Sequence, residues 1–286
     1  MKISDLFKKK NPVVSFEIFP PKPNAPFEPI LDTITALEKL EPDFISVTYG
    51  AGGSTKGRTV EIAEHIKKRP DSTIESLAHL TCITSTAAEV DDMLQHIKSR
   101  GITNILALRG DMPADSNQPA KNIFAKDLIK RIHKIGGFCI AAAAYPEGHP
   151  ECPDRAKEYE YLKEKIGTGV DFLISQIFFD NRFFYELREK MAKDNIDIPF
   201  CAGIMPVFSK SQIEHICSLC GTSIPDKVNK MMEKYGHENN DLQKAGLEYA
   251  CQQIEDLCSN QVRGIHLYTM NRPLLAKSMV EDTKLR

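Results

Sequence analysis

Short apolar runs alternate with longer amphipathic stretches along the whole chain. The runs are almost wholly apolar, as in strands that are buried on both faces of a sheet. The longer stretches repeat apolar residues at helical spacing, and glycines such as Gly101 and Gly136 follow them where C-terminal caps belong. The pattern predicts strands over 13–19, 44–49, 76–82, 104–109, 139–145, 172–179, 199–205 and 264–270. It predicts helices over 27–41, 56–69, 86–100, 122–135, 153–168, 181–195, 209–220 and 272–283.

This order of elements predicts an α/β fold, a (β/α)8 TIM barrel. Parallel strands joined by right-handed crossovers close naturally into a barrel, which needs about 250 residues. The chain has 286 residues. The stretch 224–259 interrupts the alternation and predicts an inserted pair of helices before the last strand. No linker is visible, so we expect a single domain over residues 1–286.

Polar side chains interrupt or end most of the predicted strands. Glu17 lies within the first run and His79 within the third, while Arg109, Gly110 and Asp111 follow the fourth. Further examples are Thr48 and Tyr49, Tyr145 with His149, Gln176, and Asn271 with Arg272. A barrel builds its active site from such groups at the carboxyl ends of its strands. The pattern therefore favours an enzyme.

Glu17 should point into the barrel, opposite to Phe16 and Ile18, because side chains alternate along a strand. A carboxyl there is costly unless it is paired or used, and burial favours the protonated form that a general acid needs. The alternative is a structural ion pair with a neighbouring strand.

The other polar positions also allow two interpretations. Gly110 permits close approach to a flat ligand, whereas Arg109 and Asp111 could form a surface ion pair. His79 could be a core histidine, while prolines around His149 favour contact with a ligand. Gln176 interrupts an apolar run, and its amide suits a donor- and acceptor-rich heterocycle such as a pterin, or a bond to a neighbouring strand.

Composition excludes several function classes. The net charge of −2 gives no electrostatic footprint for nucleic acid, and the run Lys8–Lys10 is short enough to be a solvated turn. No apolar stretch is long enough to span a membrane, and the start lacks the apolar region of a signal peptide. We expect a cytoplasmic protein without nucleic-acid or membrane partners.

The eight cysteines fit the same compartment. Cys217, Cys220, Cys251 and Cys258 could bind zinc if their segments met. Because both pairs lie in amphipathic helical stretches, packing is the simpler interpretation, and we predict no metal site.

Eight motifs, in order along nearly the whole chain, resemble the methylenetetrahydrofolate reductase family. They are SFEIFPP at 15–21, VTYGA at 47–51, AHLTC at 78–82, LRGD at 108–111, AYPE at 144–147 with His149, QIFFD at 176–180, GIMPV at 203–207 and YTMNR at 268–272. The length resembles the short bacterial form.

The resemblance implies a flavoprotein that reduces 5,10-methylenetetrahydrofolate to 5-methyltetrahydrofolate in one-carbon metabolism. FAD would carry the hydride, with NADH or NADPH as electron donor in a ping-pong cycle. Glu17 matches the family's general acid, Asp111 a carboxylate beside flavin and folate, and Gln176 and Arg272 substrate contacts. The positions that match flavin contacts are Thr48, Tyr49, Ala51, His79, Arg109, Gly110, Asp111, Ala125, Tyr145, His149 and Lys165.

Some positions depart from the family pattern. In the helix after the fifth strand some members carry a different polar set; the residues here are Glu158, Tyr161, Glu164 and Lys165, so adenosine contacts should differ. Phe208 lies near the position of a loop phenylalanine that covers the substrate, and Lys210 could occupy that place instead. Rival hypotheses are a pterin-binding methyltransferase, a non-catalytic barrel subunit, and a reductase fed by an electron-donating partner subunit. We also expect a homo-oligomer.

Overall fold

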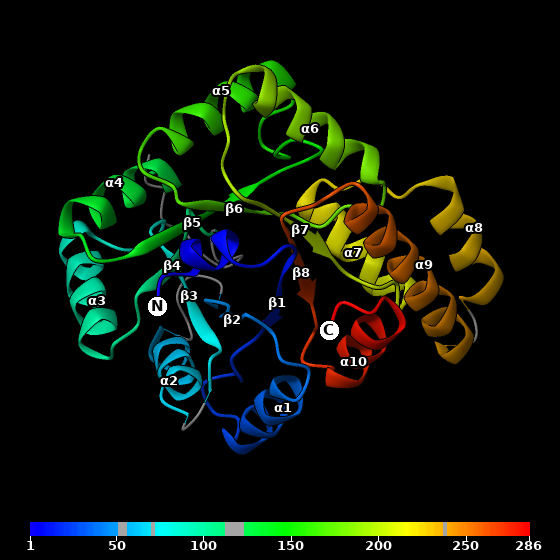
Figure 1. Ribbon diagram of the computed structural model, residues 1–286, viewed down its shortest axis with the longest axis horizontal. Coiled ribbons are helices and arrows are strands. Elements are labelled where there is room, and N and C mark those ends of the chain that lie inside the picture. Colours follow the sequence, from blue (N-terminus) through cyan, green and yellow to red (C-terminus); the bar gives the residue numbers. More distant parts are fainter. Residues whose placement is uncertain (51–55, 70–71, 112–122, 237–238) are drawn as a thin grey trace.

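The computed structural model describes residues 1–50, 56–69, 72–111, 123–236 and 239–286. Eight parallel strands, in sequence order, form a closed barrel with helices outside it (Figure 1). The predicted TIM barrel is therefore confirmed. The strands are β1 Val13–Ile18, β2 Phe44–Val47, β3 Glu75–Thr81, β4 Asn104–Leu108, β5 Cys139–Ala144, β6 Phe172–Ser175, β7 Phe200–Ile204 and β8 Gly264–Tyr268.

The helices fall where the periodicity predicts them, with ends that differ by a few residues. They are α1 Glu28–Glu38, α2 Lys56–Lys67, α3 Ala87–Ser99, α4 Ala125–Ile135, α5 Arg155–Ile166, α6 Asn181–Lys193, α7 Lys210–Cys220, α8 Asp226–Tyr235, α9 Asn239–Ser259 and α10 Pro273–Asp282. Local chemistry explains several ends. Thr86 and Glu89 form a capping box at the start of α3, and Gly136 ends α4 with a positive φ.

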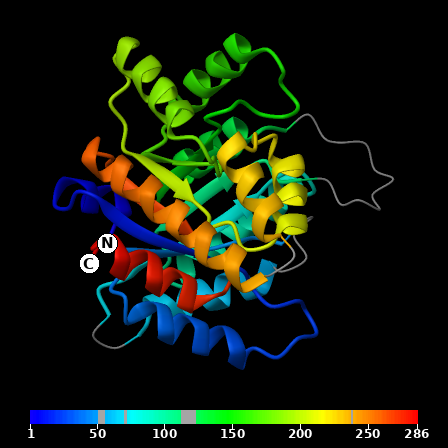
Figure 2. The same ribbon diagram turned by 90° about the vertical axis from the view of Figure 1, so that its right-hand side faces the viewer.

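The predicted helical pair before the last strand is present as α8 and α9. Helix α9 also packs against β7 and α10, so it takes a place in the outer ring of the barrel. Helices α7 and α8 instead share an apolar cluster with residues that follow β6 and β7, among them Phe179 and Val207. In Figure 2 they lie on the opposite side of the barrel from the two termini.

Alternation along the strands divides the core into two parts. Val14, Phe16 and Ile18 face the helices, in the larger apolar cluster. Val13, Phe44 and Phe172 belong to a second cluster that fills the amino-terminal half of the lumen. Glu17 and its register partner Ser46 lie further along β1 and β2 than Val13 and Phe44. The lumen therefore becomes polar toward the carboxyl ends of the strands. Because the amino-terminal half of the lumen is filled by apolar side chains, polar side chains that could bind or react with a ligand lie at the carboxyl-terminal end.

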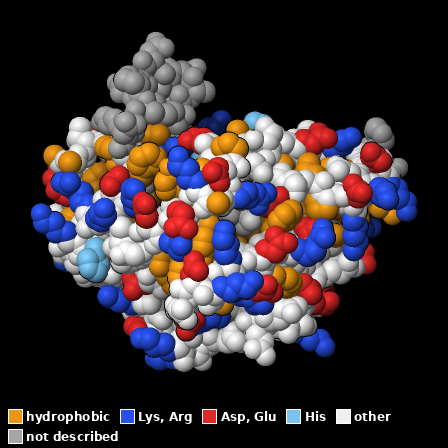
Figure 3. Space-filling view, turned by 90° about the horizontal axis from the view of Figure 1, so that it is seen from above, with side chains coloured by type: hydrophobic (Ala, Val, Ile, Leu, Met, Phe, Trp, Pro, Cys, Tyr) orange, Lys and Arg blue, Asp and Glu red, His pale blue; other side chains and the backbone are white. Residues whose placement is uncertain are grey.

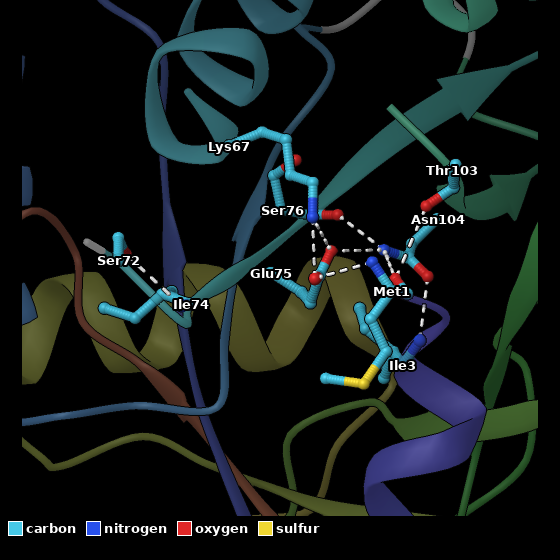
Figure 4. A network of polar contacts seen from close by, with 9 residues as sticks. All are labelled: Met1, Ile3, Lys67, Ser72, Ile74, Glu75, Ser76, Thr103 and Asn104. Atoms are coloured by element: carbon cyan, nitrogen blue, oxygen red, sulfur yellow. Dashed lines mark hydrogen bonds and ion pairs between the residues drawn. The ribbon is translucent and has the colours of Figure 1, made fainter. Parts of the chain in front are cut away.

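The amino-terminal end of the barrel is closed by the 3-10 helix η1, Ile3–Lys8. Ile3, Leu6 and Phe7 are buried in the lumen cluster. Figure 4 shows the polar contacts around this closure: the Ile3 amide donates to Asn104 Oδ1 at 2.9 Å, and Lys67 Nζ lies 2.7 Å from Glu75 Oε1. This end is packed and paired, which leaves the opposite end for ligands.

Candidate functional site

A cavity of about 490 Å³ opens at the carboxyl ends of β4 and β5, between these strands and helices α4 and α5. Five of the residues predicted to hold a flavin line it. They are Arg109, Ala125, Tyr145, His149 and Lys165. Residues far apart in the sequence therefore meet in one hollow of a size suited to a small organic ligand.

The cavity carries charges of both signs. Arg109 forms a two-bond ion pair with Glu151, with nitrogen–oxygen distances of 2.5 and 2.6 Å. This pairing raises the pKa of Arg109 and lowers that of Glu151. An anionic ligand would meet a guanidinium that already has a partner. The sequence allowed a surface ion pair of Arg109 with Asp111, but the carboxylate in contact with it is Glu151.

Lys165 brings a second cation to the cavity. Its ammonium donates to the Ala143 carbonyl at 2.6 Å. Burial lowers the pKa of Lys165 to about 8, while the nearby Glu158 carboxylate raises it. An amine that titrates near neutral pH can bind an anion strongly where little water competes.

His149 is fixed by two contacts. Its ring lies edge-on to Tyr145 with centroids 4.7 Å apart, and its Nδ1 accepts from the Glu151 amide at 3.1 Å. The accepting Nδ1 leaves Nε2 as the donor. Burial lowers the pKa of His149, so the neutral ring is favoured.

Gly110 makes the turn from β4 toward Asp111. Its φ is +85°, and a Cβ there would lie 2.8 Å from Thr81 Cβ. Both the conformation and the lack of space therefore require glycine. The turn leaves Asp111 exposed at the mouth.

Glu17 lies in the lumen, as its position in the strand predicts, and is 6% exposed. Its Oε2 is 3.5 Å from Nε2 of both His79 and His266. Burial lowers the pKa of His79 to about 4, although Glu17 opposes this shift, so the His79 ring is neutral at neutral pH. The sequence allowed an ion pair between Glu17 and a neighbouring strand; the structure places two imidazoles there.

The predicted strand 172–179 is too long, because β6 ends at Ser175. Gln176 follows that strand, partly exposed, and its Oε1 accepts from the Ile177 amide at 2.8 Å. Ile177 and Phe179 continue the apolar run because they are buried beneath α7 and α8. Gln176 therefore lies at a strand end, the position typical of barrel active sites.

Arg272 is exposed at the start of α10, and its guanidinium lies 4.8 Å from the centre of the Phe208 ring. Phe208 is buried, whereas Lys210 begins α7 and is exposed. Two hydrogen bonds join the loop after β8 to the end of β1: the Phe19 amide donates to Asn271 Oδ1, and Asn271 Nδ2 donates to the Phe19 carbonyl, each at 2.9 Å.

The remaining predicted residues lie on or just after β2 and β3. Thr48 and Tyr49 follow β2, and His79 lies on β3; none of the three lines the cavity between α4 and α5. Ala51 falls outside the described residues. Three cavity residues that the sequence analysis did not single out are Phe124, Lys126 and Glu151. The sequence feature that could have marked them as cavity residues is their position: Phe124 and Lys126 lie at the start of a predicted helix, and Glu151 follows the end of a predicted strand.

The cysteines are all free thiols, and burial raises the pKa of Cys217 to about 12 and that of Cys220 to about 11. Across the described ranges, no three histidine, cysteine or acidic side chains are grouped so as to hold a metal ion.

Within the same ranges no helix is long and apolar enough to cross a membrane. On the side that carries α5 and α6, basic and acidic side chains are interspersed (Figure 3).

Comparisons with known proteins agree with the motifs. Residues 2–284 match the methylenetetrahydrofolate reductase family. The 5,10-methylenetetrahydrofolate reductases of Pectobacterium carotovorum and Escherichia coli are 32% and 33% identical to this chain over 96% of its length, which covers 90% and 91% of theirs. A rice protein named probable methylenetetrahydrofolate reductase (NADH) is 30% identical over 99% of the chain and 51% of its own length.

Solved structures share the fold at low sequence identity. A Clostridium thermocellum protein described as binding two copies of 5-methyl-5,6,7,8-tetrahydrofolic acid has a TM-score of 0.69 at 15% identity, over 100% of this chain and 99% of its own. An oxaloacetate acetylhydrolase has a TM-score of 0.56 at 10% identity, over 100% of this chain and 84% of its own. The family match over nearly the full chain and the bacterial relatives at about a third identity establish that this chain belongs to the methylenetetrahydrofolate reductase family of oxidoreductases.

Proposed function

We propose that this protein reduces 5,10-methylenetetrahydrofolate to 5-methyltetrahydrofolate, with FAD as cofactor and NADH or NADPH as electron donor in a ping-pong cycle. Family membership supports the reaction, and the names of plant relatives support a nicotinamide donor. The folate-bound neighbour shows that a barrel of this shape can hold a tetrahydrofolate. The observation that carries the proposal is that Glu17, with its two imidazoles in the lumen, and the cavity between α4 and α5 both lie toward the carboxyl ends of the barrel strands.

The residues of the cavity fit a flavin dinucleotide. Arg109, Lys126 and Lys165 supply positive charge for a diphosphate, and Tyr145 and Phe124 supply aromatic surface. Gly110 removes the Cβ that would fill the turn beside them. FAD, when bound, supplies the hydride chemistry.

Glu17 is the proposed general acid for the folate half-reaction. Opening the bridge of the methylene group requires a proton on the departing nitrogen, and a buried carboxyl can hold one. Asp111, exposed at the mouth, is proposed to stabilise the cationic form of the folate. Gln176 and Arg272 are proposed to orient the folate by hydrogen bonds.

The test separates the two half-reactions of the Glu17→Gln variant by stopped-flow absorbance. General acid catalysis contributes about 100- to 10,000-fold, so folate reduction should fall by that amount. Flavin reduction by the nicotinamide donor should remain close to that of the unmodified protein, because that step needs no proton from Glu17. Equal losses in both half-reactions would show that Glu17 is structural.

The cofactor proposal has its own measurement. The purified protein, reconstituted with flavin, should release FAD on denaturation and should bleach anaerobically with NADH or NADPH. A protein that binds no flavin would favour the pterin-binding methyltransferase. Flavin that neither nucleotide bleaches would favour an electron-donating partner subunit.

A further inference from the structure

Glu147 lies in the AYPE motif, and the function proposed above gives it no role. The sequence around it repeats a pattern, YPEG at 145–148 and HPEC at 149–152. Each tetrapeptide forms a turn in which the amide of the fourth residue donates to the carbonyl of the first, at 3.0 and 2.8 Å. Proline is favoured at the second position of such turns because it fixes φ. The loop between β5 and α5 therefore consists of two successive turns, with a glutamate at the third position of each.

The first residues of the two turns face the cavity, whereas their glutamates have different partners. Tyr145 and His149 line the cavity, and their ring centroids lie 4.7 Å apart. Glu151 lines the same cavity, where it forms its ion pair. Glu147 does not line it, and its Oε2 accepts from the Ser223 amide at 3.0 Å. The glutamate of the first turn therefore binds a segment outside the cavity.

That segment, residues 221–223, follows α7 directly and contacts both turns; we call it the α7 exit. Ser223 donates to Glu147 of the first turn, and Gly221 lies against Pro150 of the second. The approach is close, because a Cβ added to Gly221 would lie 3.1 Å from Pro150 Cβ. Gly221 ends α7 in the left-handed conformation, with a φ of +70°. Both turns of the loop therefore rest on one short segment.

The α7 exit is itself fixed to the barrel. The buried Thr222 donates its hydroxyl to the Ile177 carbonyl at 3.0 Å and its amide to the Cys217 carbonyl at 3.1 Å. Ile177 follows Gln176 just after the end of β6, and it shares an apolar cluster with Cys217 of α7. A loop that is bound to the α7 exit is therefore held against a packed part of the molecule.

The position of the Glu147 carboxyl is costly. The residue is half-buried, and its Oε1 is buried with no hydrogen-bond partner among the described residues. Burial raises the pKa of Glu147, and the hydrogen bond from Ser223 opposes this shift. A buried polar atom without a partner calls for an explanation. The contact that offsets the cost is the hydrogen bond that joins the loop to the α7 exit.

We propose that Glu147 is a positioning residue for the flavin: it docks the loop 145–152 on the α7 exit and so holds Tyr145 and His149 at the cavity. This inference rests on the proposed function, in which the cavity holds FAD. A mobile loop would have to become ordered each time flavin binds, and the lost entropy would reduce the affinity. Glu147 supplies this order in advance, although it does not line the cavity itself.

Hydrogen exchange of the flavin-free protein, measured by mass spectrometry, tests the docking directly. In Glu147→Ala the segments 145–152 and 221–223 should exchange at least about tenfold faster, because a hydrogen bond to a charged group is lost. Glu147→Gln keeps an oxygen acceptor and should restore slow exchange. Ser223→Ala is the matched control, because it keeps the amide and removes only an exposed hydroxyl. Equal exchange in Glu147→Ala and the unmodified protein would overturn the proposal.

Flavin titration tests the consequence. Glu147→Ala should bind FAD about tenfold more weakly, and Glu147→Gln within about twofold of the unmodified protein. Gly221→Ala should also weaken binding, because its Cβ would press on Pro150. Gly101→Ala is the control: Gly101 has a similar φ of +76°, but nothing lies within 4 Å of an added Cβ. Both glycine variants should lose stability in urea, and FAD binding should weaken in Gly221→Ala alone.

The readouts separate the possible outcomes. Faster exchange in Glu147→Ala with unchanged FAD affinity would refute the positioning role. Weaker FAD binding in Gly101→Ala, equal to that in Gly221→Ala, would assign the effect to general instability and refute it as well. A protein that binds no flavin would refute the proposed cofactor, while hydrogen exchange, measured without flavin, would still decide whether Glu147 docks the loop.

Discussion

Replacement of Lys165 by methionine should stabilise the flavin-free protein while it weakens flavin binding. Burial lowers the pKa of this lysine from 10.5 to about 8, which corresponds to about 3 kcal/mol of stability lost at neutral pH. Methionine keeps the length of the side chain and removes the charge. Loss of the hydrogen bond to the Ala143 carbonyl offsets about 1 kcal/mol. We therefore expect a net gain of about 2 kcal/mol at pH 7.

The pH dependence follows from the same shift. The folded state releases the Lys165 proton near pH 8 and the unfolded state near 10.5, so the unfolded chain binds more protons between these values. Below pH 8 the full cost of the buried charge is present. The stability contributed by this site rises with pH between about 8 and 10.5. The advantage of the methionine variant should therefore shrink across that window.

Urea unfolding of the flavin-free protein, followed by circular dichroism at pH 7 and pH 9.5, measures both effects. Lys157→Met is the control, because Lys157 borders the same cavity but is exposed. Flavin titration should show about ten- to 150-fold weaker binding for Lys165→Met, as for a lost charged hydrogen bond. A variant that is less stable than the unmodified protein at pH 7, or one whose advantage does not shrink by pH 9.5, would refute the burial argument.

Three further outcomes are expected. Gln176→Leu should weaken folate and nicotinamide binding together, by about five- to 150-fold in titrations, with normal FAD content; loss of flavin would contradict a substrate-facing role. Glu151→Gln should free Arg109 from its ion pair and tighten flavin binding a few-fold at low salt, an effect that should fade in high salt. Unchanged flavin affinity at low salt would show that Glu151 does not compete with the flavin for Arg109. Gly110→Ala should lower the free energy of unfolding by about 1–3 kcal/mol in urea titrations, because the added Cβ would lie 2.8 Å from Thr81 Cβ at a positive φ; unchanged stability would show that the turn can relax.

The sequence alone predicted the barrel because each element is encoded by residues close together in the chain. The helical spacing of Leu128, Ile129 and Ile132 predicted α4, and the short apolar runs predicted the eight strands. The regular alternation of the two then left few topologies. Glu17 could be placed in the lumen from alternation alone, since Phe16 and Ile18 had to face the helices.

Contacts between distant residues depended on the tertiary structure. Ser15 and His266 lie 251 positions apart, and they meet because β8 pairs with β1 in a register that the sequence does not reveal. The run 172–179 looked like one strand, but burial under α7 and α8, rather than strand pairing, accounts for its last residues.

The charged residues of the site show the same contrast between what the sequence predicts and what the tertiary structure decides. The sequence marked Arg109 and Lys165 as candidates, yet the contact of Arg109 with Glu151 depends on the path of the loop after β5. The lowered pKa of Lys165 depends on how closely α5 packs on that strand. Periodicity and motifs depend on neighbouring residues, whereas pairing and desolvation depend on which distant surfaces meet. For that reason the sequence determined the fold and the candidate residues, and the tertiary structure decided their partners and charge states.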